Sequence, residues 1–230
     1  MISMVFVFYV FVGLAAAIGA VRGWAKEILV LISALLAIFI IFVFETYVGV
    51  YDAVVNPPAR VYVVKPEDTC EDVARELGTT VPKMLEANGL VVDVENCQLA
   101  VNSQLSYQPL TNRFWASTTI ILLLAFFGYQ TPAIKLFQAG ARREKVRDAL
   151  LGGVVGSANG YLIFGSIWWF LEKAGYENFS KVIVPPTVGS DLAIIAENLL
   201  AKMPPVYLLD APVIFITIVF AFLFVVIVYV

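Results

Sequence analysis

Long apolar runs separated by short polar connectors make up most of the chain. Uncharged runs long enough for a helix that crosses a hydrocarbon core of roughly 30 Å cover residues 1–21, 28–44, 114–133, 149–171 and 211–230. The first run has no basic residues before it and is longer than the apolar part of a signal peptide, so we expect a retained helix. The pattern predicts a membrane all-α helical bundle with about five transmembrane helices.

The pattern changes between residues 61 and 109, where it predicts the order strand, helix, helix, strand. Residues 61–64 are β-branched or aromatic, as is typical of strands, and residues 104–107 would close the sheet. Thr69 and Asp72 have the spacing of a capping box at the start of the first helix. This segment therefore predicts a small inserted α+β domain of the form βααβ.

Four residues set the ends of the two predicted helices in this insert. Gly78 would end the first helix, because glycine tolerates the left-handed backbone found there. Thr80 would cap the second helix, and Asn88 with Gly89 would end it. The chain then divides into residues 1–60 with the first two membrane helices, 61–109 with the inserted domain, 110–210 with the third and fourth membrane helices and an outer amphipathic segment, and 211–230 with the fifth helix.

Composition agrees with a membrane protein and removes several classes of function. The chain is 60% hydrophobic and only 14% charged, with a mean hydropathy of +0.86. Histidine is absent, which removes the commonest haem, zinc and copper ligand and the ordinary general base. We therefore expect no metal, no cofactor and no enzymatic activity. A net charge of −3, with no basic stripe, argues against nucleic acid as a partner.

The charges of the connectors predict an orientation, because Lys and Arg beside membrane helices stay on the cytoplasmic side. The two basic connectors follow the first and third spans. Their charged residues on the cytoplasmic side would include Arg22, Lys26, Arg142, Arg143, Lys145 and Arg147. We expect a multi-pass protein of the bacterial cytoplasmic (inner) membrane, with residues 61–109 extracytoplasmic and the lipid bilayer as its surroundings.

The only two cysteines, Cys70 and Cys97, lie in the segment that the charges alone place outside. Two thiols in one small domain of an oxidising compartment favour a structural disulfide. The alternative is a pair of buried free cysteines that behave as small apolar residues.

The insert resembles a LysM domain over about 48 residues. The resemblance rests on residues 62–69, 73–74, 77–81, 85 and 87–90. It implies binding of polymers that contain N-acetylglucosamine, such as peptidoglycan, in a shallow groove between two loops. The positions that would line the groove are Pro66, Glu67, Asp68 and Thr69 on one wall and Asn88, Gly89, Leu90 and Val91 on the other.

Two departures from the LysM pattern lie near this groove. Glu67 stands where the family has a glycine, and residues 101–103 replace the usual Pro-Gly turn. A bulky carboxylate in the first loop would hinder the close approach of a glycan. Two interpretations therefore stay open: a peptidoglycan-binding module, or a rigid spacer that offers a contact surface to another protein.

The fourth span carries a stripe of small residues, with Gly152, Gly156 and Gly160 spaced by four. Such a stripe lets another helix backbone approach closely. The partner would be the first span of the same chain, or another membrane subunit or a second copy. Asn159 lies deep in this span, where it would form an interhelical hydrogen bond or mark a pathway.

The helices themselves resemble the colicin V production protein (CvpA) family. The resemblance rests on residues 19–29, with their Arg-Gly bend, and on residues 148–156, and it extends over roughly 8–50 and 112–205. It implies a small helical membrane bundle associated with colicin V export and envelope maintenance, and it supplies no catalytic residues to carry over to this sequence. The fifth span goes beyond the family's four helices.

Three functions follow from these observations. The first is an envelope protein that presents a LysM-like glycan-binding module outside the membrane. The second is a structural or accessory subunit of a larger membrane complex, and the third is a component of an export or transport system. The third has the weakness that the spans contain no charged residue at depth, as coupled transport usually requires.

Overall fold

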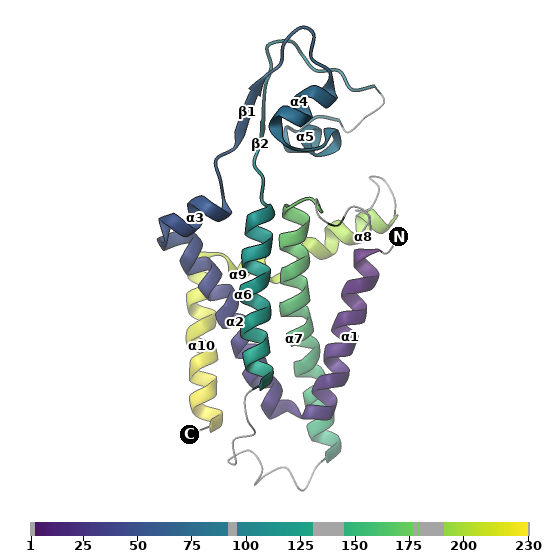
Figure 1. Ribbon diagram of the computed structural model, residues 1–230. Helices are drawn as coiled ribbons and strands as arrows, with labels where there is room; N and C mark the ends of the chain where they lie inside the picture. The colour runs from purple at the N-terminus through teal and green to yellow at the C-terminus, as the bar shows by residue number, and fades with distance from the viewer. Residues whose placement is uncertain (1–2, 92–95, 131–144, 177–178, 180–190, 230) are drawn as a thin grey trace.

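The structure is a computed structural model that describes residues 3–91, 96–130, 145–176, 179 and 191–229. Long helices lie side by side in a bundle, and a small domain with two strands stands at one end of it (Figure 1). The described elements are α1 (Met4–Arg22), α2 (Trp24–Tyr47), α3 (Gly49–Val55), β1 (Arg60–Val63), α4 (Cys70–Leu77), α5 (Val81–Ala87), β2 (Gln104–Tyr107), α6 (Thr111–Gln130), α7 (Lys145–Lys173), α8 (Asp191–Leu200), α9 (Pro204–Leu208) and α10 (Ala211–Tyr229).

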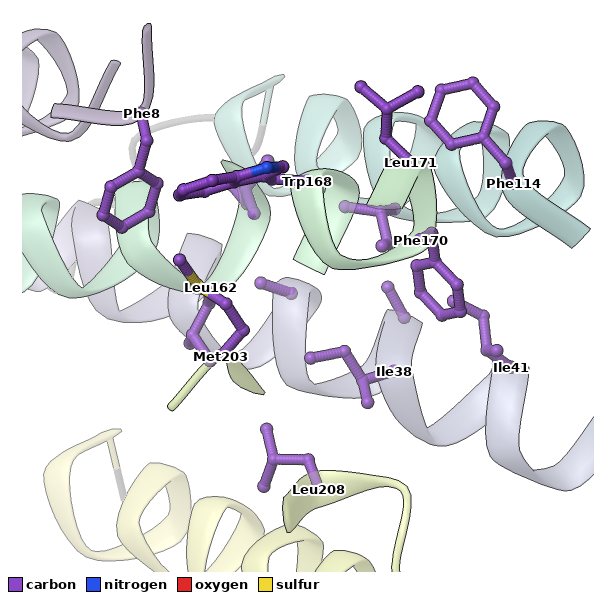
Figure 2. Packing of buried hydrophobic residues seen from close by; sticks show 14 of the residues in the cluster. Phe8, Ile38, Ile41, Phe114, Leu162, Trp168, Phe170, Leu171, Met203 and Leu208 are labelled. Carbon is purple, nitrogen blue, oxygen red and sulfur yellow. The ribbon is translucent and has the colours of Figure 1, made fainter. Parts of the chain in front are cut away.

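The core of the bundle is formed by α2, α6 and α7, with α1 packed along α7. Phe8 of α1 lies against Trp168 of α7, with ring centroids 5.6 Å apart. Met203, just before α9, is fully buried beside them (Figure 2). Phe170 extends from α7 toward Ile41 of α2 in the same view. Large apolar side chains from separate segments of the chain therefore meet in one continuous core.

The described residues contain fewer candidate membrane helices than the five that the sequence predicts. Among the described residues, three helices are long and apolar enough to cross a membrane: α1, α2 and α7. A fourth candidate is the pair 192–208 and 211–224, whose halves meet at a bend of 74°. The fifth predicted span is thus half of a bent pair. The third predicted span, now α6, does not qualify, because its first turns are polar; its last residues, 131–133, lie outside the described part.

Helix α8 is the predicted outer amphipathic segment, and it lies at the same end of the bundle as the small domain (Figure 1). The structure buries Ala193 and Ala196 of this helix and leaves Leu192 and Ile195 about half exposed. The face of α8 that meets the bundle therefore contains Ala196, with Leu199 and Leu200 partly buried against the same core.

Two chain segments connect the bundle to the small domain, one on each side, and polar contacts fix both. Arg113 of α6 forms a two-pronged ion pair with Glu45 of α2, with both N–O distances 2.7 Å. Asn112 donates to the Val54 carbonyl of α3, and Gln108 donates to the Pro57 carbonyl. These contacts connect the segment that leads from α2 to β1 with the segment that leads from β2 to α6, at the end of the bundle.

Candidate functional site

The small domain has the predicted βααβ order. Strands β1 and β2 pair antiparallel, with Arg60 opposite Tyr107 and Val63 opposite Gln104. Val64 and Leu105 are buried under the helices, whereas Val61 and Val63 are exposed on the other face of the sheet. The two helices thus cover one face of a two-stranded sheet.

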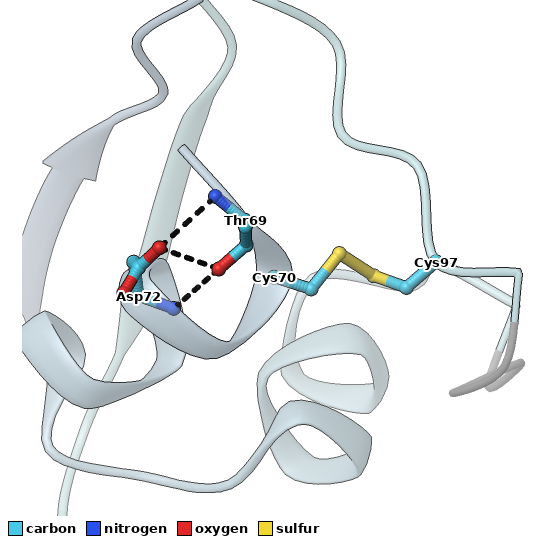
Figure 3. Close-up of a disulfide and its surroundings, with 4 residues drawn as sticks. All are labelled: Thr69, Cys70, Asp72 and Cys97. Atoms are coloured by element: carbon cyan, nitrogen blue, oxygen red, sulfur yellow. Dashed lines mark hydrogen bonds between the residues drawn. A yellow bond between two sulfur atoms is a disulfide. The ribbon is translucent and has the colours of Figure 1, made fainter. Parts of the chain in front are cut away.

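The start of α4 has the predicted capping box (Figure 3). The Asp72 amide donates to the Thr69 hydroxyl at 3.2 Å, and the Thr69 amide donates to the Asp72 carboxylate at 3.3 Å. The Thr69 hydroxyl also donates to the Asp72 carboxylate, and this bond, with the one from the Thr69 amide, lowers the pKa of Asp72 below its ordinary value because both stabilise the carboxylate. Gly78 ends the helix in the left-handed conformation with φ of +74°, as predicted.

The second helix, α5, begins after Thr80 and ends at Asn88, as predicted, but Thr80 does not cap it through its side chain. At the other end, the Asn88 amide donates to the carbonyls of Met84 and Ser106, at 2.7 and 3.0 Å. The Asn88 oxygen accepts from the Ser106 amide at 2.9 Å. Asn88 therefore fastens α5 to β2, so its side chain supports the groove wall rather than lining it.

The first wall of the candidate groove contains Pro66, Glu67, Asp68 and Thr69, of which all but Asp68 are exposed. Asp68 accepts a hydrogen bond from the Lys65 amide at 2.8 Å, and its own amide donates to the Lys65 carbonyl. A hydrogen bond with Asp68 also raises the pKa of Tyr62. Asp68 and Thr69 thus brace the loop through their side chains, whereas the Glu67 carboxylate is in solvent.

The second wall follows Asn88 and is apolar. Gly89 has φ of +66°, which suits glycine, and a Cβ there would meet nothing within 4 Å. Leu90 and Val91 are 41% and 85% exposed. An apolar surface and an open backbone therefore face solvent on this side.

The turn before β2 replaces the family's Pro-Gly with Asn102, which takes φ of +64°. Asparagine tolerates this left-handed conformation better than most residues. Its amide donates to the Val64 carbonyl at 2.8 Å, so the turn still closes the sheet.

The disulfide between Cys70 and Cys97 is present, with a Cα–Cα distance of 6.3 Å (Figure 3). Cys70 directly follows the first wall, and Cys97 lies in the segment that follows the second. The bond therefore links the two chain segments that carry the walls.

The small domain also rests on the bundle. The Lys83 side chain of α5 lies over Gly175, just after α7, where a Cβ would be 2.7 Å from Lys83 Cε. Beneath it, Tyr176 accepts a hydrogen bond from Trp168 Nε1 at 2.9 Å and donates to the Glu172 carboxylate. Burial, above all, raises the pKa of Tyr176, and the neighbouring Glu172 adds to the shift. Sequence reasoning missed this contact, because no local pattern relates α5 to the end of α7.

The glycine stripe of α7 lies against α1. A Cβ on Gly152 would be 2.3 Å from the Gly19 carbonyl oxygen, and one on Gly156 would be 2.4 Å from the Ala15 oxygen. A Cβ on Gly160 would be 2.9 Å from the Val12 Cα. The two helix backbones therefore touch within the chain along the whole stripe.

Asn159, on the same helix, joins a buried polar cluster with Arg22 and Glu27. Its Nδ2 donates to the Glu27 carboxylate at 2.8 Å and to the Glu27 carbonyl at 2.9 Å. Glu27 is fully buried and pairs with Arg22 at 2.7 Å. The sequence placed Glu27 in a polar connector and did not predict its burial. The Arg-Gly bend turns α2 back along α1 and α7, and this brings Glu27 inward.

The basic residues used to predict orientation gather at one end. Arg22, Lys26, Lys145 and Arg147 belong to the ends of α1, α2 and α7 that lie opposite the small domain (Figure 1). Arg142 and Arg143 lie outside the described residues. Among the described residues there is no group of three or more side chains suited to a metal ion.

Comparison with known proteins identifies the small domain. The LysM domain family matches residues 62–105. No curated protein and no solved structure matches the chain. The match covers both helices, both walls of the candidate groove and part of each strand, and it leaves the long helices without an assigned family.

Proposed function

We propose that this chain is an integral membrane protein of the bacterial envelope that presents its LysM domain on the outer side of the cytoplasmic membrane, where the domain binds peptidoglycan. The observation that carries the proposal is the LysM match at residues 62–105, with its intact βααβ fold. LysM domains suggest binding of peptidoglycan or a related glycan.

The two walls of the candidate groove support glycan binding, because one is polar and the other is apolar. Leu90 and Val91 offer apolar surface for the faces of sugar rings, and exposed backbone at Gly89 offers hydrogen-bonding groups for N-acetyl substituents. The disulfide and the Asn88 contacts hold the walls in place before a ligand arrives, which reduces the entropy lost on binding. The Glu67 side chain in the first loop is exposed to solvent.

The membrane placement is supported by the three apolar helices and by the separation of basic residues from the LysM domain. Arg22, Lys26, Lys145 and Arg147 would lie beside the cytosol, in agreement with the usual charge bias. The disulfide fits an oxidising compartment at the opposite end.

Retention of the purified full chain on insoluble peptidoglycan tests the proposal. We expect the Leu90→Asp/Val91→Asp double variant to lose retention, because it replaces the apolar wall with charge. The control is Val61→Ser/Val63→Ser, which alters the exposed far face of the sheet and should bind like the wild type. A wild-type chain retained no better than a denatured sample would contradict the proposal.

A second candidate is a component of an export or transport system, and the buried Arg22–Glu27–Asn159 cluster favours it. Ionisable residues inside membrane helices commonly mark pathways or proton relays. An accessory subunit of a larger complex would instead co-purify with other membrane proteins in mild detergent.

A further inference from the structure

A buried polar cluster lies where α1 turns into α2, at the opposite end of the bundle from the LysM domain (Figure 1). Its centre is the Glu27 carboxylate, which is 0% exposed. Glu27 Oε1 accepts from Arg22 Nη1 at 2.7 Å, and Oε2 accepts from Asn159 Nδ2 at 2.8 Å. Burying a carboxylate inside an apolar helical bundle costs free energy, and such residues inside membrane helices are commonly functional.

Arg22 does not depend on Glu27 alone. Its Nη2 donates to the Tyr129 carbonyl at 3.0 Å, and its guanidinium lies 4.6 Å from the centre of the Tyr129 ring. The Arg22 side chain is also 21% exposed. The arginine would therefore keep its charge, a hydrogen bond, an aromatic partner and access to solvent if the carboxylate became neutral.

Asn159 offers a partner for that neutral state. It is fully buried, and its Oδ1 is without a hydrogen-bond partner in the described structure. A carboxylate can only accept hydrogen bonds, whereas a carboxylic acid donates one. Rotation of the acid or the amide about its terminal torsion would pair the acid's O–H with Oδ1, and such torsions are soft. The cluster thus contains partners for both forms of Glu27.

The other ionisable groups near Glu27 contact other residues or face solvent. From α7, Asp148 accepts a hydrogen bond from the Trp24 amide at 3.3 Å and packs against Gly23. From α6, Tyr129 faces Arg22, and on α2 itself Lys26 is exposed. Glu27 is therefore the carboxylate that the cluster surrounds.

We propose that Glu27 is a reversible proton-binding site of the helical bundle, with Arg22 and Asn159 Nδ2 holding the carboxylate and Asn159 Oδ1 receiving the acid's proton. A proton from water adds to one carboxylate oxygen, and no other covalent bond changes. The Arg22–Glu27 ion pair, which lies beside the turn at Gly23, is then lost. This role goes beyond glycan binding and does not depend on it.

Infrared spectroscopy of the purified full chain during acid titration tests this site. We expect the carbonyl band of a protonated, buried carboxylic acid to appear as the pH falls, while the helices remain folded. Glu27→Gln should abolish the band. Glu45→Gln is the matched control, because Glu45 is also on α2 and pairs with Arg113, and it should keep the band.

Asn159→Leu supplies a second readout. Without Oδ1 the acid loses its acceptor, so the band should move to higher wavenumber. A wild-type chain with no such band before unfolding would mean that Glu27 is a permanently ionised structural residue, and it would overturn the proposal. So would a band that survives in Glu27→Gln. If Glu27→Gln fails to fold, the Asn159→Leu variant decides. A band at the same wavenumber in Asn159→Leu and in the wild type would overturn the proposal.

Discussion

The Asn88 side chain of the LysM domain makes one hydrogen bond within its own helix and others to a distant strand. Its side chain joins Met84, four residues before it, to Ser106, eighteen residues after it. The sequence predicted Asn88 as the end of a helix but could not predict the second contact, because that contact exists only once β2 has paired with β1. The capping box of Thr69 and Asp72 was predictable, since both partners lie within one turn.

Thr69→Ala should destabilise the start of α4 by about 1 kcal/mol, because it removes the hydroxyl that accepts from the Asp72 amide. Faster hydrogen exchange of the first amides of α4, in the full chain, would report the loss. Thr80→Ala is the matched control: Thr80 also stands at a helix cap but forms no capping bond, so exchange in α5 should change less. Equal effects of the two substitutions would contradict the assignment.

Asp72 predicts a pH dependence at the same site. Its pKa is lower in the folded state than its ordinary value of 3.8, so the folded domain favours the carboxylate. The resulting stabilisation is fully present above the ordinary pKa and is lost as the pH falls through the folded pKa. Hydrogen exchange in α4 should therefore accelerate at acid pH relative to the intrinsic rate. Asp72→Asn should remove that dependence, and a dependence left unchanged in this variant would assign it to another group.

Helices and their contacts were predictable to different degrees. The apolar runs indicated α1, α2 and α7 well, because length and hydropathy are local properties. The same reasoning missed the short helices α3 and α9, although it separated the segment of α8 from α10. The stripe at Gly152, Gly156 and Gly160 predicted close packing but left its partner open, since small residues suit any approaching helix. The structure assigns the contact to Ala15 and Gly19 of α1.

Gly152→Ala should destabilise the bundle by about 1–3 kcal/mol, because its Cβ would lie 2.3 Å from a backbone oxygen of α1 and overpacking is costly. The neighbouring Gly153→Ala is the control, since its Cβ would make ordinary contacts of 3.7 Å. The midpoint of thermal unfolding in detergent measures both. Similar midpoints for the two variants would argue against close α1–α7 packing.

Removal of the disulfide by Cys70→Ser/Cys97→Ser should destabilise the LysM domain by about 3 kcal/mol, because the bond restricts the unfolded chain. The two groove walls are tied through this bond, so peptidoglycan retention should weaken as well. Denaturant unfolding of the LysM domain within the full chain, followed by hydrogen exchange, gives the first quantity. Unchanged stability would show that the other contacts of the domain suffice.

At the scale of the whole molecule, the two ends of the bundle differ in chemistry. One end carries the LysM domain, braced by the Arg113–Glu45 pair and by Lys83 over Gly175. The other end carries the basic residues and the Glu27 cluster. The sequence predicted the charge difference, but it did not predict the burial of Glu27. That burial depends on Asn159, which is 132 residues away and reaches Glu27 only after α7 has packed against α1 and α2.

The central claim is that the membrane separates these two ends, with the LysM domain outside. Labelling of intact cells with a membrane-impermeant maleimide, after treatment with an impermeant reductant, tests it most directly. In the wild-type chain, Cys70 and Cys97 should be labelled from outside. A second chain carries Cys70→Ser/Cys97→Ser and Lys145→Cys. Its single cysteine should react only after the membrane is permeabilised. Labelling of the Lys145→Cys site in intact cells, with Cys70 and Cys97 protected, would contradict the account.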